Sequence, residues 1–269
     1  MKKQFVSILA GATLFGLTAF AGCSVDVTKY NRYDNADKYT AGSFTYAATG
    51  ITDIDIDWVV GSVTLVQSDN AELSVSESGA SLSEDEKVHY WIDRGTLNIK
   101  FCKSGWKGNL DDKEKNLTVE IPQGVDLDVD NVSGKIVAEN VSVGELSVEN
   151  VSGNVTLGNV IARELSVENV SGGIQINGLT AGDISIDGVS GSIELSELSA
   201  PKAEIETVSG KITLTLAPSQ GANVSFDSAS GKLKSEKKYS KNGDNYSFAG
   251  EGDILQVEAE TSSGDFIVK

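Results

Sequence analysis

Carboxylate side chains recur every 19 residues in the second half of the chain. One column, preceded by Asp130, consists of Glu149, Glu168, Asp187 and Glu206. A second consists of Glu145, Glu164 and Asp183 and ends at Lys202. Calcium takes carboxylate oxygens as ligands, so a stack of these side chains indicates a stripe that binds a cation, with weak calcium binding, or faces a sugar. The alternative is a solvated face whose charges are screened by salt.

The other reactive side chains form no catalytic constellation. His89 is the single histidine, and Cys102 is the only cysteine besides Cys23. No zinc set of histidines and cysteines can be built from them, and a Ser-His-Asp site would have to use His89. No nucleophile elbow, phosphate loop or dinucleotide-binding glycine pattern occurs. We expect His89 to be structural, Cys102 to be a half-buried thiol, and the protein not to be an enzyme.

The N-terminal segment has the pattern of an export signal. A basic start at residues 1–3 precedes an apolar stretch over residues 5–20, which is too short to favour a membrane-spanning helix. The following Phe20-Ala21-Gly22-Cys23 resembles a bacterial lipobox, with Phe20 where leucine is usual. The resemblance implies cleavage before Cys23 and a diacylglycerol on its sulfur, which would attach the protein to a membrane. The alternative is an ordinary signal peptide cut nearby, with Cys23 incidental.

A tandem repeat determines the expected architecture. Val-Ser-Gly occurs at residues 132–134, 151–153, 170–172, 189–191 and 208–210, with echoes at Ala229-Ser230-Gly231 and Ser262-Ser263-Gly264. Apolar residues keep the same step, as in the column Ile136, Val155, Ile174, Ile193 and Ile212. Within each repeat, apolar and polar residues alternate, which is typical of strands with one buried face.

These columns predict an all-β fold, a single-stranded parallel β-helix (β-solenoid) with coils of about 19 residues. An antiparallel sandwich of hairpins would also suit the strand spacing, but it has no need for identical residues at a fixed step. We divide the chain into a lipoprotein signal peptide (1–22), a lipid-anchored tether (23–45), irregular N-terminal β coils and cap (46–130), regular repeats (131–233), and a C-terminal insertion with capping strands (234–269). Arg94-Gly95 resembles a hairpin turn.

The chain resembles the bacterial putative-adhesin family, a domain of unknown function with serial β-strands. The residues that carry the resemblance are the Val-Ser-Gly repeats, Gly61-Ser-Val-Thr-Leu65, Gly95-Thr-Leu-Asn-Ile99 and Leu117-Thr-Val-Glu-Ile-Pro-Gln-Gly124. It covers roughly residues 46–269. The resemblance implies a right-handed β-helix in the cell envelope, and it brings no catalytic residues with it.

The net charge of −17 argues against nucleic acid and anionic lipid as partners. We therefore expect a non-catalytic, surface-anchored lipoprotein outside the cytoplasm. Its role would be that of an adhesin or envelope scaffold with a glycan or protein ligand. One alternative is an envelope-stress accessory protein that binds a membrane sensor. Another is a β-helix enzyme that acts on polysaccharides, which the missing catalytic constellation disfavours.

Overall fold

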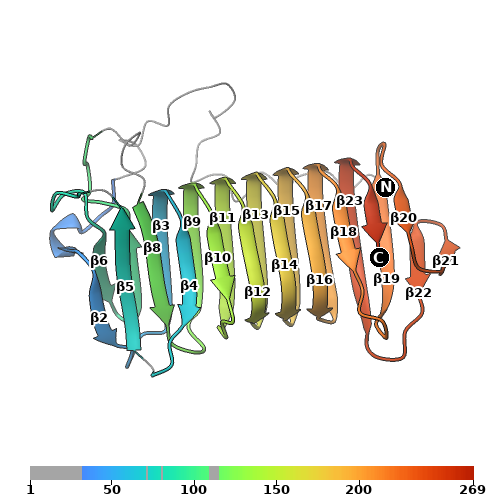
Figure 1. The fold of residues 1–269 in the computed structure, drawn as a ribbon, viewed down its shortest axis with the longest axis horizontal. Coiled ribbons are helices and arrows are strands. Elements are labelled where there is room, and N and C mark those ends of the chain that lie inside the picture. The colour runs from blue at the N-terminus through green and yellow to red at the C-terminus, as the bar shows by residue number, and fades with distance from the viewer. Residues whose placement is uncertain (1–31, 71, 80, 109–114) are drawn as a thin grey trace.

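The computed structural model describes residues 32–269 except 71, 80 and 109–114. Two long sheets face each other along the molecule (Figure 1). Sheet A has thirteen strands, in the spatial order β1 (Thr40–Ala41), β6 (His89–Asp93), β7 (Thr96–Lys100), β3 (Asp53–Val60), β9 (Asp126–Ser133), β11 (Glu145–Ser152), β13 (Glu164–Ser171), β15 (Asp183–Ser190), β17 (Lys202–Ser209), β23 (Ile254–Ser263), β19 (Gly221–Ser228), β22 (Asn245–Phe248) and β21 (Tyr239–Asn242).

Sheet B has eleven strands, in the order β2 (Phe44–Ala47), β5 (Glu72–Gly79), β8 (Lys115–Ile121), β4 (Val63–Gln67), β10 (Ile136–Glu139), β12 (Val155–Ile161), β14 (Ile174–Thr180), β16 (Ile193–Ser199), β18 (Ile212–Thr215), β24 (Phe266–Val268) and β20 (Leu233–Ser235). A short 3-10 helix, Ala36–Lys38, precedes them in the described part of the chain.

Each coil of the regular region is one strand of sheet A followed by one strand of sheet B. Coils stack in parallel with a step of 19 residues, so that Leu146 lies beside Leu165 and Val155 beside Ile174. This confirms the predicted β-solenoid and its coil length. Parallel pairing between successive repeats also excludes the antiparallel sandwich for this region.

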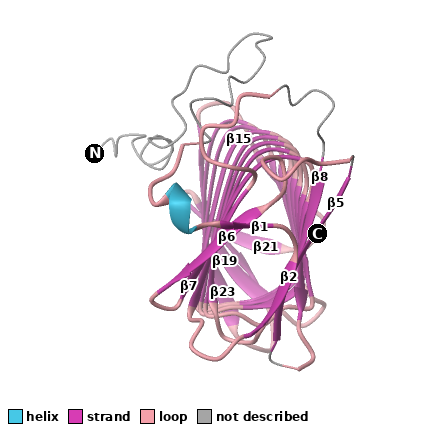
Figure 2. Cartoon of the chain, turned by 90° about the vertical axis from the view of Figure 1, so that its left-hand side faces the viewer, coloured by secondary structure: helices cyan, strands magenta, loops and turns pink. Residues whose placement is uncertain are grey.

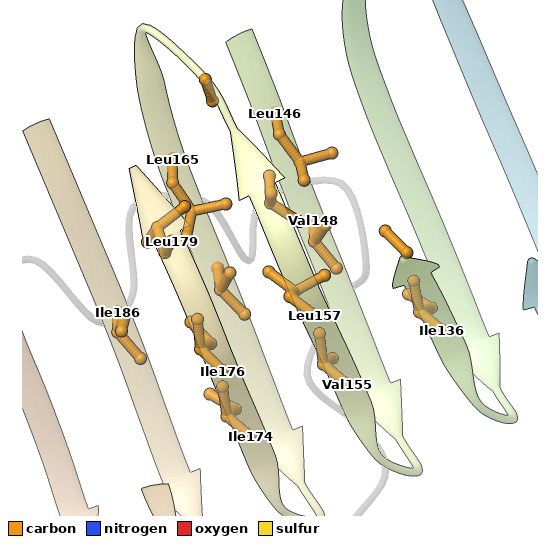
Figure 3. Close-up of a cluster of buried hydrophobic side chains, with 14 of the residues drawn as sticks. Ile136, Leu146, Val148, Val155, Leu157, Leu165, Ile174, Ile176, Leu179 and Ile186 are labelled. Atoms are coloured by element: carbon orange, nitrogen blue, oxygen red, sulfur yellow. The ribbon is translucent and has the colours of Figure 1, made fainter. Parts of the chain in front are cut away.

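The core lies between the two sheets, and alternation along each strand supplies it. Inward positions such as Ile136, Leu157 and Leu165 are almost fully buried, and Figure 3 shows these side chains in the space between the two sheets. Each large aliphatic side chain contributes roughly 1.5–3 kcal/mol when it leaves water. A single coil buries too little to hold itself, so stacking is what makes the fold stable.

The glycine of each Val-Ser-Gly triplet stacks on the glycine of the neighbouring coil. At Gly153 the backbone has φ 129, and a methyl group there would overlap the carbonyl oxygen of Gly134. Only glycine fits this corner, because the backbones of adjacent coils touch. In spatial order the column is Lys115, Gly61, Gly134, Gly153, Gly172, Gly191, Gly210, Gly264 and Gly231. Lys115 begins the column because no parallel strand precedes β8, whose other neighbour, β5, runs antiparallel to it.

The end of the stack at β1 and β2, which we call the cap end, is closed by residues 33–45, the cap segment, which we predicted to be tether. Tyr33 donates its hydroxyl hydrogen to the carbonyl oxygen of Cys102 at 3.0 Å. The short β1 then pairs with β6, and β2 pairs with β5. The Phe44 ring stacks on that of Tyr90, with 3.6 Å between centroids. Figure 2 looks onto this end. The tether prediction is therefore wrong for the cap segment, whose aromatic side chains favour packing over solvent.

The opposite end, which we call the tip, departs from the order of the chain. β23 lies between β17 and β19, and β24 lies between β18 and β20. Residues 254–268 were predicted as capping strands, but they form an internal coil, while β19, β20 and the β21–β22 hairpin form the end. The two Ser-Gly echoes explain this order, because Gly264 stacks on Gly210 and Gly231 stacks on Gly264.

The predicted turn at Arg94-Gly95 is confirmed. β6 and β7 pair antiparallel with Asp93 opposite Thr96. Both turn residues have positive φ, 50° for Arg94 and 96° for Gly95. This is the geometry of the two-residue turns that suit the twist of a hairpin.

Candidate functional site: the carboxylate ladder of sheet A

The predicted carboxylate column exists and lies on the outward face of sheet A. Asp130, Glu149, Glu168, Asp187 and Glu206 occupy successive strands in exact register. They alternate along each strand with buried residues such as Val148 and Val167, so their side chains point away from the core. Adjacent strands lie roughly 4.8 Å apart, so these carboxylates form a straight row.

The row is longer than the repeats predicted. Asp57 pairs with Asp130 at one end, and Glu260 pairs with Glu206 at the other. Asp227 follows Glu260. The repeats did not predict these three because β3, β23 and β19 lie outside the 19-residue step. One signal could have found Asp57, because residues 53–57 (DIDID) repeat the pattern of residues 126–130 (DLDVD). We call the eight residues the carboxylate ladder: Asp57, Asp130, Glu149, Glu168, Asp187, Glu206, Glu260 and Asp227.

Crowding and partial burial change the acidity of the ladder. Burial, reinforced by the charges of Glu149 and Asp128, raises the pKa of Asp130 to about 7. Burial and the charge of Glu168 raise the pKa of Asp187 to about 6. The pKa values of Glu149, Glu168 and Glu206 are also raised, mainly by burial and then by neighbouring carboxylates. The ladder therefore holds excess negative charge that a cation would relieve.

Basic residues neutralise the ladder only at its margins. Lys100 is in register with Asp57 and forms ion pairs with it and, at 3.6 Å, with Asp55. In the neighbouring column, Lys202 lies beside Asp183, as predicted, and pairs with Glu204. Arg163 pairs with Glu145 of that same column. Among the described residues, Asp57 is the only member of the carboxylate ladder that takes part in an ion pair.

The ladder is a row and not a cage. Among the described residues, no group of three or more histidine, cysteine, aspartate or glutamate side chains is arranged to hold a metal ion. Any cation would meet two neighbouring carboxylates and would complete its shell with water or other oxygen ligands. Calcium binding at Glu149, Glu168, Asp187 and Glu206 stays a prediction.

The remaining predicted residues lie elsewhere. Cys23 falls outside the described residues, so its lipidation stays a prediction. His89 is buried at the cap end, where its Nδ1 lies 2.9 Å from the carbonyl oxygen of Lys87. Cys102 is fully buried, not half-buried, and the Tyr33 hydroxyl of the cap segment donates to its carbonyl oxygen. No helix in the described part of the chain is long and apolar enough to cross a membrane.

Comparison with known proteins gives a family model and several solved structures. The model described as "Toastrack DUF4097" matches residues 51–232. A "putative adhesin" from Bacteroides fragilis NCTC 9343 shares the fold with 16% identity and a TM-score of 0.51, over 84% of this chain and 96% of that one. A "putative cell adhesion protein" from Clostridium sporogenes ATCC 15579 has 12% identity and a TM-score of 0.38, over 86% and 99%. No curated protein matches the chain.

Proposed function

The chain belongs to the Toastrack DUF4097 family, and on this premise we propose that it is a non-catalytic, lipid-anchored adhesin or interaction scaffold of the cell envelope. The observation that supports the proposal best is the carboxylate ladder, eight acidic residues in register on the outward face of one sheet. A rigid, regular face of one charge suits repeated contact with an extended cationic partner.

The rigidity and the charge of this face favour binding with little loss of conformational entropy. The strands are fixed by pairing on both sides, so a partner does not have to order a flexible loop. A row of like charges raises the local concentration of cationic groups and speeds their approach. Protonation equilibria near neutrality, as for Asp130, would make the contact sensitive to pH.

The proposed anchor orients the molecule. Arg32, where the described chain begins at the cap end, follows Cys23 closely in the sequence. The segment from Cys23 to Arg32 can span at most about 30 Å when it is fully extended. A lipid on Cys23 would therefore keep the cap end near the membrane, and the tip would face away from it. Fatty-acid labelling of cells expressing the protein should mark the wild type and not Cys23→Ser; a labelled variant would remove the anchor.

The interaction role can be tested with two matched triple variants. One neutralises the ladder, Glu149→Gln with Glu168→Gln and Asp187→Asn. The other removes the same charge from exposed positions of sheet B, Glu120→Gln with Glu139→Gln and Glu194→Gln. Purified mature protein would be measured on host cells, matrix proteins and glycan arrays. We expect wild type and the sheet B variant to bind the same surface and the ladder variant to bind at least about tenfold more weakly. Equal binding by all three proteins would contradict the role of the ladder, and turnover of a polysaccharide would contradict a non-catalytic function.

A further inference from the structure

Sheet A extends further than sheet B at the tip. Beyond the coil of β19 and β20, sheet A continues with β22 and β21, whereas sheet B ends at β20 (Figure 1). No strand of sheet B, as far as the structure describes the chain, lies opposite the hairpin. A cavity of about 360 Å³ lies there, which is within the range of small-ligand sites. We call it the tip cavity; it is lined by Phe226, Asp227, Ser228, Gly231, Lys232, Leu233, Tyr239, Lys241, Asp244 and Tyr246.

An exposed aromatic ring borders the cavity. Tyr239 keeps 45% of its surface exposed, although tyrosine usually buries its ring. Its ring is held in place by Tyr246 and Phe248, with centroids 5.5 Å and 5.7 Å away. A ring that is fixed on one side and open on the other offers a flat apolar surface on which the ring of a ligand can pack.

Lysines are frequent in one of the segments that line the cavity, beside the two lining carboxylates Asp227 and Asp244. Five lysines lie between residues 232 and 241 of a chain whose net charge is −17. Lys232 and Lys241 line the cavity. The Lys241 ammonium lies 4.7 Å from the Tyr246 ring centroid, and its hydrogen bond to Tyr246, together with the charge of Asp244, raises its pKa. The Lys241 ammonium is therefore charged at neutral pH, and together with Lys232 it can pair with an anion.

We propose that the tip cavity binds a saccharide that carries a carboxylate group. The sugar ring would pack on Tyr239, the carboxylate would pair with Lys232 and Lys241, and Asp227 and Asp244 would accept hydrogen bonds from sugar hydroxyls.

The inference deepens the proposed function. It rests on that proposal for the position of the tip relative to the membrane. With the cap end at the membrane, the tip cavity is at the most outward point of the molecule, where a surface glycan would first meet it. Binding of the saccharide itself does not depend on the anchor, because every lining residue belongs to the tip.

Calorimetric titration with tetragalacturonate, in calcium-free buffer, tests the proposal. Its fully methyl-esterified form is the matched neutral probe, because it keeps the sugar rings and lacks the charge. We expect the acid to bind at least about tenfold more tightly than the ester. Lys232→Ala with Lys241→Ala, and separately Tyr239→Ala, should each weaken binding of the acid at least about tenfold. Lys234→Ala with Lys238→Ala removes the same charge from exposed lysines outside the lining and should retain binding.

Three results would overturn the proposal: no binding of the acid by wild type at millimolar concentration, equal binding of acid and ester, or an equal loss in both lysine pairs. Thermal melting of each variant shows whether it is folded. The cell and matrix assay separates this inference from the proposed function. If wild type does not bind the acid while the ladder variant alone loses binding to a surface, the tip proposal fails and the adhesin proposal stands. If wild type binds the acid but no surface, the adhesin proposal fails.

Discussion

The core would be exposed at both ends of the stack, and the two ends are covered in different ways. At the cap end, Lys115 takes the place of the corner glycine, and its side chain is buried. At the tip, the glycine column continues to Gly231, and the end is covered by a hairpin that leaves the tip cavity. One end is packed like a core, and the other keeps polar groups and space. The comparison indicates that stability is concentrated near the proposed anchor and binding near the tip.

Lys115 is the clearest sign of this packing. Its Nζ donates to Glu77 Oε2 at 3.0 Å, to the carbonyl oxygen of Glu86 at 2.6 Å and to that of Phe101. Burial lowers the pKa of Lys115, and the charge of Glu77 opposes that shift. Three acceptors match the three hydrogens of an ammonium, so the charged form is fully satisfied. The rings of Phe101 and Trp58 lie beside it.

The largest expected effect breaks this cluster. Lys115→Met keeps the length of the side chain but leaves the buried Glu77 without its partner, which costs about 3–5 kcal/mol. Chemical denaturation would measure the loss, and Lys135→Met, at an exposed corner, is the control. The double variant with Glu77→Gln should recover part of it. A loss at Lys115 no larger than at Lys135 would show that the cap end is not packed as described.

The second expected effect lies at the tip. In Gly264→Ala the new methyl group would overlap the carbonyl oxygen of Gly210, so the inserted coil must shift. Overpacking of this kind costs about 1–3 kcal/mol. Gly252→Ala, in the loop before β23, has open space around it and should be neutral. If thermal melting shows the same stability for both variants, the inserted strand does not have the close contact that distinguishes this end.

The third prediction concerns the carboxylate ladder, which runs from one end to the other. The pKa of Asp130 is raised from 3.8 to about 7, so the folded state binds more protons than the unfolded state between those values. The contribution of Asp130 to the free energy of unfolding is fully present below pH 4 and is lost as the pH rises through 7. Asp130→Asn should therefore stabilise the protein above pH 7 by about 1 kcal/mol, after allowance for solvent screening.

Glu206 provides the comparison within the ladder. Its pKa is raised in the same direction, first by burial and then by Asp187, but Glu206 lies closer to the tip. We expect Glu206→Gln to change the pH dependence of stability less than Asp130→Asn does. Denaturation from pH 4 to 9 would measure both. Equal curves would show that the contrast between the two ends does not extend to their acidic faces.

The smallest expected effect is calcium binding at the ladder. Calcium that binds only the folded state stabilises it by about 0.4 kcal/mol when its concentration equals the Kd. The melting temperature in calcium should exceed that in sodium at equal ionic strength. Glu168→Gln with Asp187→Asn should abolish the difference. Identical curves for wild type in the two salts would leave the ladder without a calcium-specific role.

The sequence predicts the elements that repeat and not those that interrupt the repeat. The step of 19 residues predicts that Glu149, Glu168 and Asp187 share a register, and the strand pairing confirms it. The same step does not place Glu260, because strand order at the tip depends on long-range pairing that no local pattern encodes. The packing of the cap segment also has no sequence signal, since its aromatic side chains are scattered without a period. The tip cavity depends on sheet A extending beyond sheet B, which only the full topology shows.

The inserted coil has a consequence for how the protein is made. A chain that leaves the ribosome with its N-terminal side first can stack the coils from β9 to β18 as they emerge. Residues 221–248 emerge next, but their place in sheet A requires β23, which is synthesised after them. Until then β17 presents an unpaired edge, which invites pairing with the wrong strand. The end of the molecule therefore forms only once residues 254–263 are available, and a chain that ended before residue 254 would leave the edge of β17 unpaired.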